Sequence, residues 1–200
     1  MIKRIFFDLD GVLTTDKTGS FTTSKYFAEK LGINFKEVFE YNKKFDGDTD
    51  SGKISNLDAW KKTCEKFGVE FNPNYLYEAF ISTPIDEKMV QYAIQLKDKC
   101  KVGIISDNSV ERANSIIEKN NWSDIFDVIV ISDEVRCTKK ETRIFEISAQ
   151  RAKVNPEECI FIDNKQKNIE VSKVAGMKGI YFDDAIRDYE KLRDIIENLL

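Results

Sequence analysis

The chain has 200 residues, of which 42% are hydrophobic and 33% charged, with a formal net charge of −4 and no histidine. This composition is ordinary for a soluble globular protein, and the mild, evenly mixed charge argues against nucleic acid or a membrane as a partner. The lack of histidine excludes triads, general bases and zinc sites that depend on that residue.

The first predicted element is a β-strand over residues 5–9, which form a short apolar run. Residues 16–83 then contain no convincing strand, only short segments with helical spacing and turn material such as Asp46-Gly47-Asp48. The helical segments are 24–31, 35–45, 57–67 and 75–81. Because this stretch has no repeat and no low-complexity linker, we interpret residues 16–83 as a packed helical cap domain.

Residues 84–200 alternate between helical spacing and short apolar runs, and the last segment predicts an amphipathic helix. The apolar runs are residues 102–105, 128–131, 159–162 and 180–182. None alternates with polar residues, which is typical of strands buried on both faces. We therefore predict an α/β fold, in which residues 1–15 and 84–200 form a doubly wound parallel, Rossmann-like sheet core.

Two acidic residues follow the first strand, in the sequence Asp8-Leu9-Asp10-Gly-Val-Leu-Thr. Ligands of parallel sheets bind at the carboxyl ends of the strands, and strand alternation would place both carboxylates on one side. Two such close acids need a divalent cation or a proton between them, and they suit a nucleophile paired with a general acid/base. The alternative is a strand end capped by turn-forming aspartates, but the flanking strand and Gly-Val-Leu-Thr favour a functional interpretation.

Four short motifs at predicted strand ends together resemble the haloacid dehalogenase-like (HAD) superfamily. The resemblance covers the whole chain and points to the phosphatases and phosphomutases that carry a helical cap after the first motif. It implies that Asp8 is the nucleophile and that Asp10 is the general acid/base.

The second and third motifs supply candidate phosphate-binding residues. By resemblance, Ser106 hydrogen-bonds the substrate phosphate with help from the backbone amide of Asp107, where many relatives have Asn. Considered alone, Ser106-Asp107 would be an ordinary helix cap. The pattern Ser-x-Glu-Val followed by a lysine selects Lys139 as a phosphate ligand. Lys140 replaces the usual proline, and an isolated lysine would be a solvated surface residue.

The fourth motif ends the strand at residues 159–162 with Asp163 and Asn164. The resemblance implies a Mg²⁺ site between Asp8, the Asp10 backbone carbonyl and the corner formed by Asp163 and Asn164. Family members often have a second aspartate where this chain has Asn164. An amide oxygen can bind a hard cation but brings no charge, so we predict weaker magnesium binding than in relatives with two aspartates.

The resemblance implies a Mg²⁺-dependent phosphatase that hydrolyses a small phosphorylated metabolite through an aspartyl-phosphate on Asp8. The helical cap would close over the site as a lid. Three alternatives stay open to different degrees. Asp10 argues against a dehalogenase, the sequence allows a phosphomutase, and the departures at Asp107, Lys140 and Asn164 support a non-catalytic phosphate-binding or regulatory protein.

Several features favour a cytoplasmic protein. The four cysteines are far apart and form no C-x-x-C pair, which indicates reduced thiols. Asp8 and Asp10 interrupt the first apolar run too early for a signal peptide, and no stretch approaches the roughly 18 apolar residues of a membrane span. The sequence does not specify an oligomeric state.

Overall fold

The computed structural model describes all 200 residues and contains one parallel sheet of five strands, in the order β3-β2-β1-β4-β5. The first strand occupies the centre, where it pairs with β2 on one side and β4 on the other. The predicted α/β class and the five predicted strands are therefore confirmed. Their bounds are Arg4–Phe7 (β1), Lys101–Ser106 (β2), Val128–Ile131 (β3), Cys159–Asp163 (β4) and Lys178–Tyr181 (β5).

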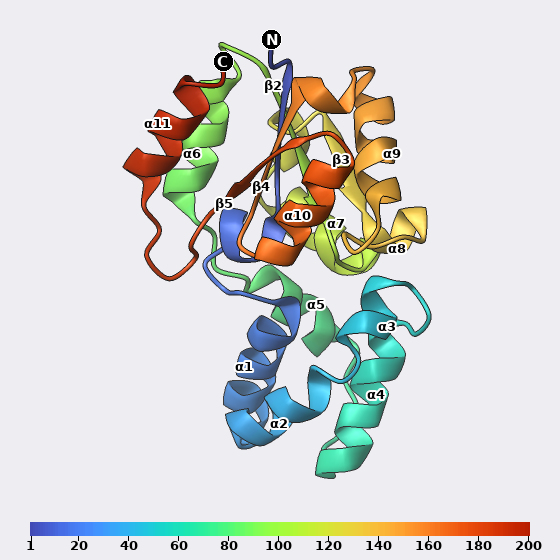
Figure 1. Cartoon of the computed structure of the whole chain (residues 1–200). Coiled ribbons are helices and arrows are strands. Elements are labelled where there is room, and N and C mark those ends of the chain that lie inside the picture. Colours follow the sequence, from blue (N-terminus) through green and yellow to red (C-terminus); the bar gives the residue numbers. More distant parts are fainter.

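Helices cover both faces of the sheet, which explains the continuous apolar strands (Figure 1). Ile5 and Phe7 of β1 pack into a cluster with α6, α7 and α11, whereas Phe6 packs on the opposite face with α9 and α10. These helices are α6 (Glu87–Leu96), α7 (Val110–Lys119), α9 (Thr142–Ala152), α10 (Gln166–Val174) and α11 (Tyr189–Glu197). Short helices are η1 (Leu9–Leu13), η2 (Trp122–Asp124), α8 (Ser132–Val135) and η3 (Pro156–Glu158).

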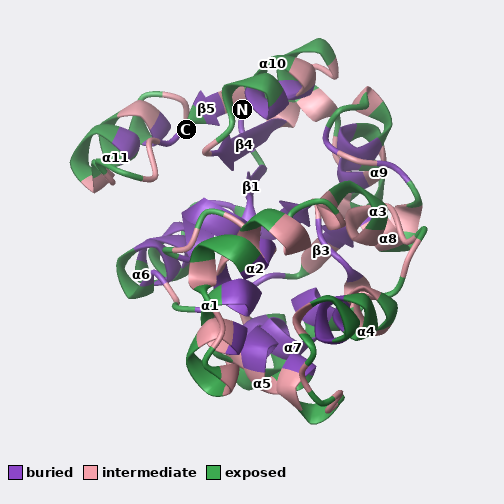
Figure 2. Cartoon of the chain, turned by 90° about the horizontal axis from the view of Figure 1, so that it is seen from below, coloured by how far each residue is buried: buried purple, intermediate pink, exposed green.

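Five further helices lie beyond the carboxyl edge of the sheet and are called the cap helices below (Figure 1). They are α1 (Gly19–Leu31), α2 (Phe35–Asn42), α3 (Asp46–Asp50), α4 (Asn56–Phe67) and α5 (Asn74–Ile81). In Figure 2, α4 and α5 show a buried side and an exposed side, whereas α3 has no buried residue. Phe27 and Trp60, whose rings stack with centroids 3.7 Å apart, belong to their own small hydrophobic cluster. The predicted domain boundaries, 1–15 with 84–200 and 16–83, stay a prediction.

The turn predicted at Asp46-Gly47-Asp48 is wrong, because these residues form the short helix α3. A glycine among aspartates has low helix propensity, so nothing local predicts this helix. Contacts from distant elements hold its two ends instead. Ser20 Oγ donates to Asp46 Oδ2 at 3.0 Å, and Ser132 Oγ donates to the Asp50 carbonyl at 2.5 Å.

Both connections to the cap helices run side by side. Thr14 forms an antiparallel bridge with Ile85, and the Thr15 amide donates to the Pro84 carbonyl at 3.0 Å. Arg187, from the loop between β5 and α11, braces the first connection by donating to the carbonyls of Gly11 and Val12 at 3.2 and 3.0 Å. The loop that follows Asp8 is therefore held from two distant parts of the chain.

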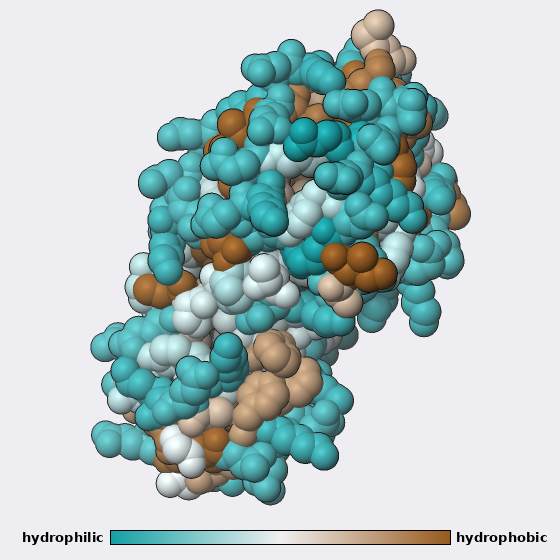
Figure 3. Space-filling model, turned by 90° about the vertical axis from the view of Figure 1, so that its left-hand side faces the viewer, coloured by the Kyte–Doolittle hydropathy of each residue, from teal (hydrophilic) through white to brown (hydrophobic).

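All four cysteines are buried and unpaired. The face in Figure 3 is mostly hydrophilic, and its hydrophobic side chains form small separate groups. None of the helices combines the length and apolar character needed to cross a membrane.

Candidate active site

Three predicted residues meet where the central strands end. Asp8 follows β1 directly, Ser106 is the last residue of β2, and Asp163 is the last residue of β4. A cavity of about 160 Å³ separates this edge from the cap helices, and Asp8, Asp10, Asp107 and Lys139 line it from the sheet side. The parallel topology thus gathers side chains that are up to 155 positions apart, from 8 to 163.

Lys139 is the centre of a buried ion cluster. Its Nζ lies 2.6 Å from Asp8 Oδ1 and 2.8 Å from Asp163 Oδ2, and its side chain is 1% exposed. The Asp107 carboxylate accepts a hydrogen bond from the Lys139 backbone amide at 2.8 Å. Asp107, which departs from the family pattern, therefore fixes the loop that carries the lysine.

The ion cluster has one negative charge in excess when all three groups are ionised, since two carboxylates surround one ammonium. Burial raises the pKa of Asp8, the neighbouring Asp163 carboxylate raises it further, and Lys139 and Lys165 lower it only in part. Burial disfavours the charge of Lys139, but Asp163 and Asp8 outweigh burial and raise its pKa. A cation or a proton next to Asp8 would balance the cluster.

Asp10 reaches the cavity by a route that strand alternation does not describe. The strand ends at Phe7, and η1 turns the chain through Gly11, whose φ of +81° lies in the left-handed region. The Asp10 carboxylate contacts the core helix α7 instead of Asp8. Arg112 donates to both of its oxygens at 2.8 Å, and Asn108 Nδ2 donates to Oδ2 at 3.1 Å.

Sequence reasoning missed Arg112 and Asn108. The one available signal was an arginine beside the apolar face of α7 that includes Ala113 and Ile116.

Three buried polar atoms in this region have no hydrogen-bond partner, namely Ser106 Oγ, Asn164 Oδ1 and Arg112 Nε. The Asn164 amide lies against the turn that carries Asp10, since a Cβ on Gly11 would be 2.2 Å from Asn164 Nδ2. Buried polar groups are normally satisfied, so unpaired oxygens at this position favour a ligand. Both oxygens lie at the carboxyl edge of the sheet, since Ser106 ends β2 and Asn164 follows β4.

The donor set fits a hard cation such as Mg²⁺, which prefers oxygen ligands. Asp163 accepts from Lys139 Nζ and Asn168 Nδ2 through one oxygen and from the Lys165 amide through the other. No group of three His, Cys, Asp or Glu residues could hold a metal alone. A site here would therefore need the Asn164 amide oxygen and a backbone carbonyl beside the Asp8 carboxylate.

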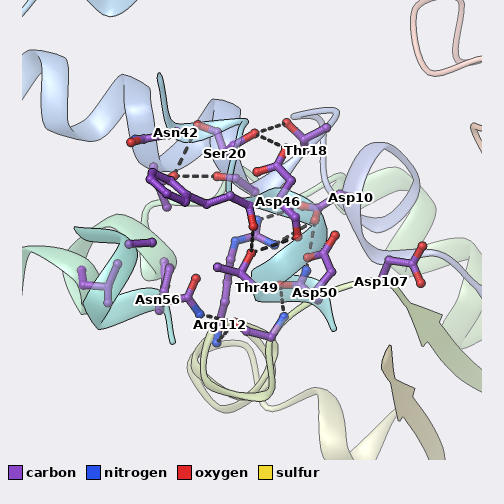
Figure 4. Close-up of a pocket in the computed structure, with 18 of the residues that line it drawn as sticks. Asp10, Thr18, Ser20, Asn42, Asp46, Thr49, Asp50, Asn56, Asp107 and Arg112 are labelled. Atoms are coloured by element: carbon purple, nitrogen blue, oxygen red, sulfur yellow. Dashed lines mark hydrogen bonds and ion pairs between the residues drawn. The ribbon is translucent and has the colours of Figure 1, made fainter. Parts of the chain in front are cut away.

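The cap side of the cavity is acidic. Asp46 and Asp50 of α3 project toward Asp10 (Figure 4). Burial raises the pKa of Asp46 to about 6 and the pKa of Asp50 to about 7. Asp46 Oδ2 accepts a hydrogen bond from Ser20 Oγ at 3.0 Å. The remaining cap lining is rich in hydroxyl and amide groups, including those of Thr23, Asn42 and Thr49.

The comparisons with known proteins agree on one family. The model of the haloacid dehalogenase-like hydrolases matches residues 2–176. A β-phosphoglucomutase of Bacillus subtilis is 26% identical over 187 residues, which cover 88% of this chain and 81% of that protein. A pyrimidine 5'-nucleotidase of Escherichia coli is 29% identical over 161 residues, or 74% of this chain and 70% of that protein.

A solved structure shows the same fold. A HAD family enzyme from Bacteroides thetaiotaomicron, in complex with magnesium and inorganic phosphate, superimposes with a TM-score of 0.73. It is 22% identical, and the match covers 91% of this chain and 94% of that one. The α/β sheet core with helices beyond its carboxyl edge is thus an arrangement that other HAD enzymes share.

Proposed function

The chain belongs to the haloacid dehalogenase-like hydrolases, and from this premise we propose that it is a Mg²⁺-dependent phosphatase for small phosphorylated metabolites. The observation that carries the proposal is the buried cluster in which Lys139 contacts Asp8 and Asp163. The unpaired Ser106 Oγ at the end of the neighbouring strand β2 supports it. A nucleophile, a phosphate-binding lysine and a free hydroxyl donor are the groups that phosphoryl transfer needs.

In this mechanism an Asp8 oxygen forms a bond to phosphorus while the bond to the leaving oxygen breaks. Asp10 gives its proton to that oxygen, and Ser106 and Lys139 hold the phosphate oxygens. A water molecule then attacks the aspartyl-phosphate, Asp10 takes a proton from it, and Asp8 is regenerated. Mg²⁺, held by Asp8, Asn164 and the Asp10 carbonyl, with Asp163 beside them, would supply charge neutralisation.

The alternatives are separated by their products. A phosphomutase returns a phosphorylated isomer, whereas a phosphatase releases inorganic phosphate. A dehalogenase needs no acid at Asp10, and here three donated hydrogen bonds hold that residue at the cavity wall. A phosphate-binding or regulatory protein would bind phosphate without turnover.

The acidic cap side of the cavity favours substrates without a second anionic group. At a pH above their raised pKa values of about 6 and about 7, Asp46 and Asp50 are ionised and would repel an additional carboxylate or phosphate. They can accept hydrogen bonds from hydroxyl or ammonium groups. A cavity of about 160 Å³ also suits a small leaving alcohol.

The direct test measures phosphate release from p-nitrophenyl phosphate and from a panel of metabolite phosphates, with Mg²⁺ and with EDTA. We expect turnover in Mg²⁺ to exceed that in EDTA by at least about 100-fold, which corresponds to about 2.7 kcal/mol. Turnover of phosphate esters of neutral polyols or amino alcohols should exceed turnover of matched esters that carry a second anionic group by about tenfold. No phosphate release from any ester would favour the binding role, and isomer formation would favour a mutase.

Asn164→Asp should bind Mg²⁺ more tightly than the parent. The substitution adds a carboxylate against the turn that carries Asp10, at a position where the amide oxygen has no partner. We expect the Mg²⁺ dissociation constant, measured by calorimetry without substrate, to fall by about tenfold. Lys165→Gln, which removes the positive charge of the next residue, is the control for a general change in local charge. Equal affinity in Asn164→Asp and parent would contradict Asn164 as a metal ligand.

A further inference from the structure

Arg112 is the main contact of the Asp10 carboxylate. Its two terminal nitrogens each lie 2.8 Å from a different carboxylate oxygen, the bidentate arrangement that arginine makes with acids. Arg112 is 3% exposed and Asp10 is 8% exposed, so water competes little for this pair. Asn108 Nδ2 adds a third donor, so Oδ2 accepts from both residues. Oδ1 accepts from Arg112 alone and keeps one lone pair that can carry the proton for the leaving oxygen.

The same guanidinium also contacts both connections to the cap helices. Arg112 Nη2 donates to Thr83 Oγ1 at 3.3 Å, just before the second connection returns to the core. On the first connection, a Cβ at Gly19 would lie 2.9 Å from the guanidinium carbon, so the backbone that begins α1 packs directly on Arg112. The side chain thus lies between Asp10 and the two segments that any movement of the cap helices must bend.

We propose that Arg112 is a positioning residue that sets the place of the Asp10 carboxylate relative to the leaving group and couples it to the cap connections. This inference rests on the proposed function, in which Asp10 protonates the leaving oxygen. Arg112 touches Asp10 and cap backbone, and it takes no part in bond making or breaking. A lysine at this position keeps the positive charge but cannot hold both oxygens in one plane.

The test compares two substrates that differ in their need for a general acid. A p-nitrophenyl leaving group departs without a proton, whereas the best alkyl phosphate of the substrate panel needs one. The value of kcat/KM reports the transfer to Asp8, which is the step that expels the leaving group. For Arg112→Lys we expect kcat/KM to fall about 10- to 100-fold with the alkyl ester and less than about threefold with the aryl ester.

The second transfer step gives a further readout. Hydrolysis of the aspartyl-phosphate also needs Asp10, so kcat and KM for the aryl ester should fall together in Arg112→Lys. Adding Arg112→Lys to Asp10→Asn should cause no further loss, because the positioned group is already absent. Thermal unfolding of each variant confirms that it is folded, and Arg112→Gln provides a second variant at the same position.

Arg4→Lys is the matched control. Arg4 is also 3% exposed and paired with one aspartate, Asp127, but it lies at the opposite end of β1. The Arg4→Lys variant should lower the stability of the protein without changing the ratio of kcat/KM for the alkyl ester to kcat/KM for the aryl ester. If Arg112→Lys lowers kcat/KM equally for both esters, or if its loss of activity adds fully to that of Asp10→Asn, the positioning role is wrong while the proposed phosphatase activity stands. If the parent shows no turnover dependent on Asp8, the proposed function fails and this inference fails with it.

Discussion

Replacing Asp8 by Asn is expected to lower phosphatase turnover by about 10⁴-fold or more, the size seen when a catalytic nucleophile is removed. The amide keeps the shape of the side chain and an oxygen that can accept from the Leu9 amide, which lies 2.7 Å from Asp8 Oδ1. It has no anionic oxygen to attack phosphorus. The measurement is phosphate release at saturating Mg²⁺ and substrate.

The same substitution should leave the protein folded, which separates a chemical role from a structural one. Removal of one carboxylate relieves its repulsion with Asp163, which contributes to the raised pKa of Asp8. The unfolding midpoint of Asp8→Asn should therefore equal or exceed that of the parent without metal. Asp124→Asn, an exposed change of the same kind, controls for net charge. Turnover of Asp8→Asn within tenfold of the parent, or no phosphoryl group on the Asp8 peptide of the quenched parent, would refute the nucleophile.

Lys139→Met is expected to destabilise the protein by about 3–5 kcal/mol, because it leaves two buried carboxylates without their partner. The pKa of Asp8, which burial and Asp163 already raise, would then rise further, because Lys139 no longer lowers it. When the pKa of a carboxyl group is higher in the folded than in the unfolded protein, the folded state becomes less stable as pH rises through the folded pKa. The loss of unfolding free energy in Lys139→Met should therefore be greater at pH 8 than at pH 5. Urea unfolding at the two pH values, with EDTA present, measures both effects.

The neighbouring lysine gives a matched control for this prediction. Lys140 is exposed, so Lys140→Met should change the free energy of unfolding by no more than about 0.5 kcal/mol. Asp163→Asn added to Lys139→Met should restore part of the lost stability, since one unpaired charge disappears. If Lys139→Met is as stable as the parent at pH 8, the buried ion cluster does not contribute as described. If Lys139→Met and Lys140→Met lower the free energy of unfolding by similar amounts, the choice of Lys139 over Lys140 is contradicted.

Residues placed by strand topology could be predicted from the sequence. Asp8, Ser106 and Asp163 each end or follow an apolar run, and parallel strands bring their carboxyl ends to one edge. Lys139 was selected by motif spacing, and the structure places its ammonium between Asp8 and Asp163. A continuous apolar strand records burial on both faces, so it is a strong local signal.

Other features depend on contacts that no local pattern encodes. Arg112 meets Asp10 across 102 positions, and its helix would form equally well with another residue there. Helix α3 also depends on distant contacts, since hydrogen bonds from Ser20 and Ser132 hold this five-residue segment of poor helix formers. Asp8 and Asp10 do line the same cavity, but strand alternation is not the reason, because the strand ends before Asp8 and the turn through Gly11 sets the direction of Asp10.

The burial of all four cysteines has a practical consequence for following the cap helices. Their relative exposures of 3%, 8%, 2% and 0% shield them from maleimide reagents in the folded protein. One engineered surface cysteine on α4 and another on α10 would accept a pair of fluorophores without prior removal of the native thiols. Energy transfer between the dyes would then report, in single molecules, whether the distance between the cap helices and the core changes when ligand is added.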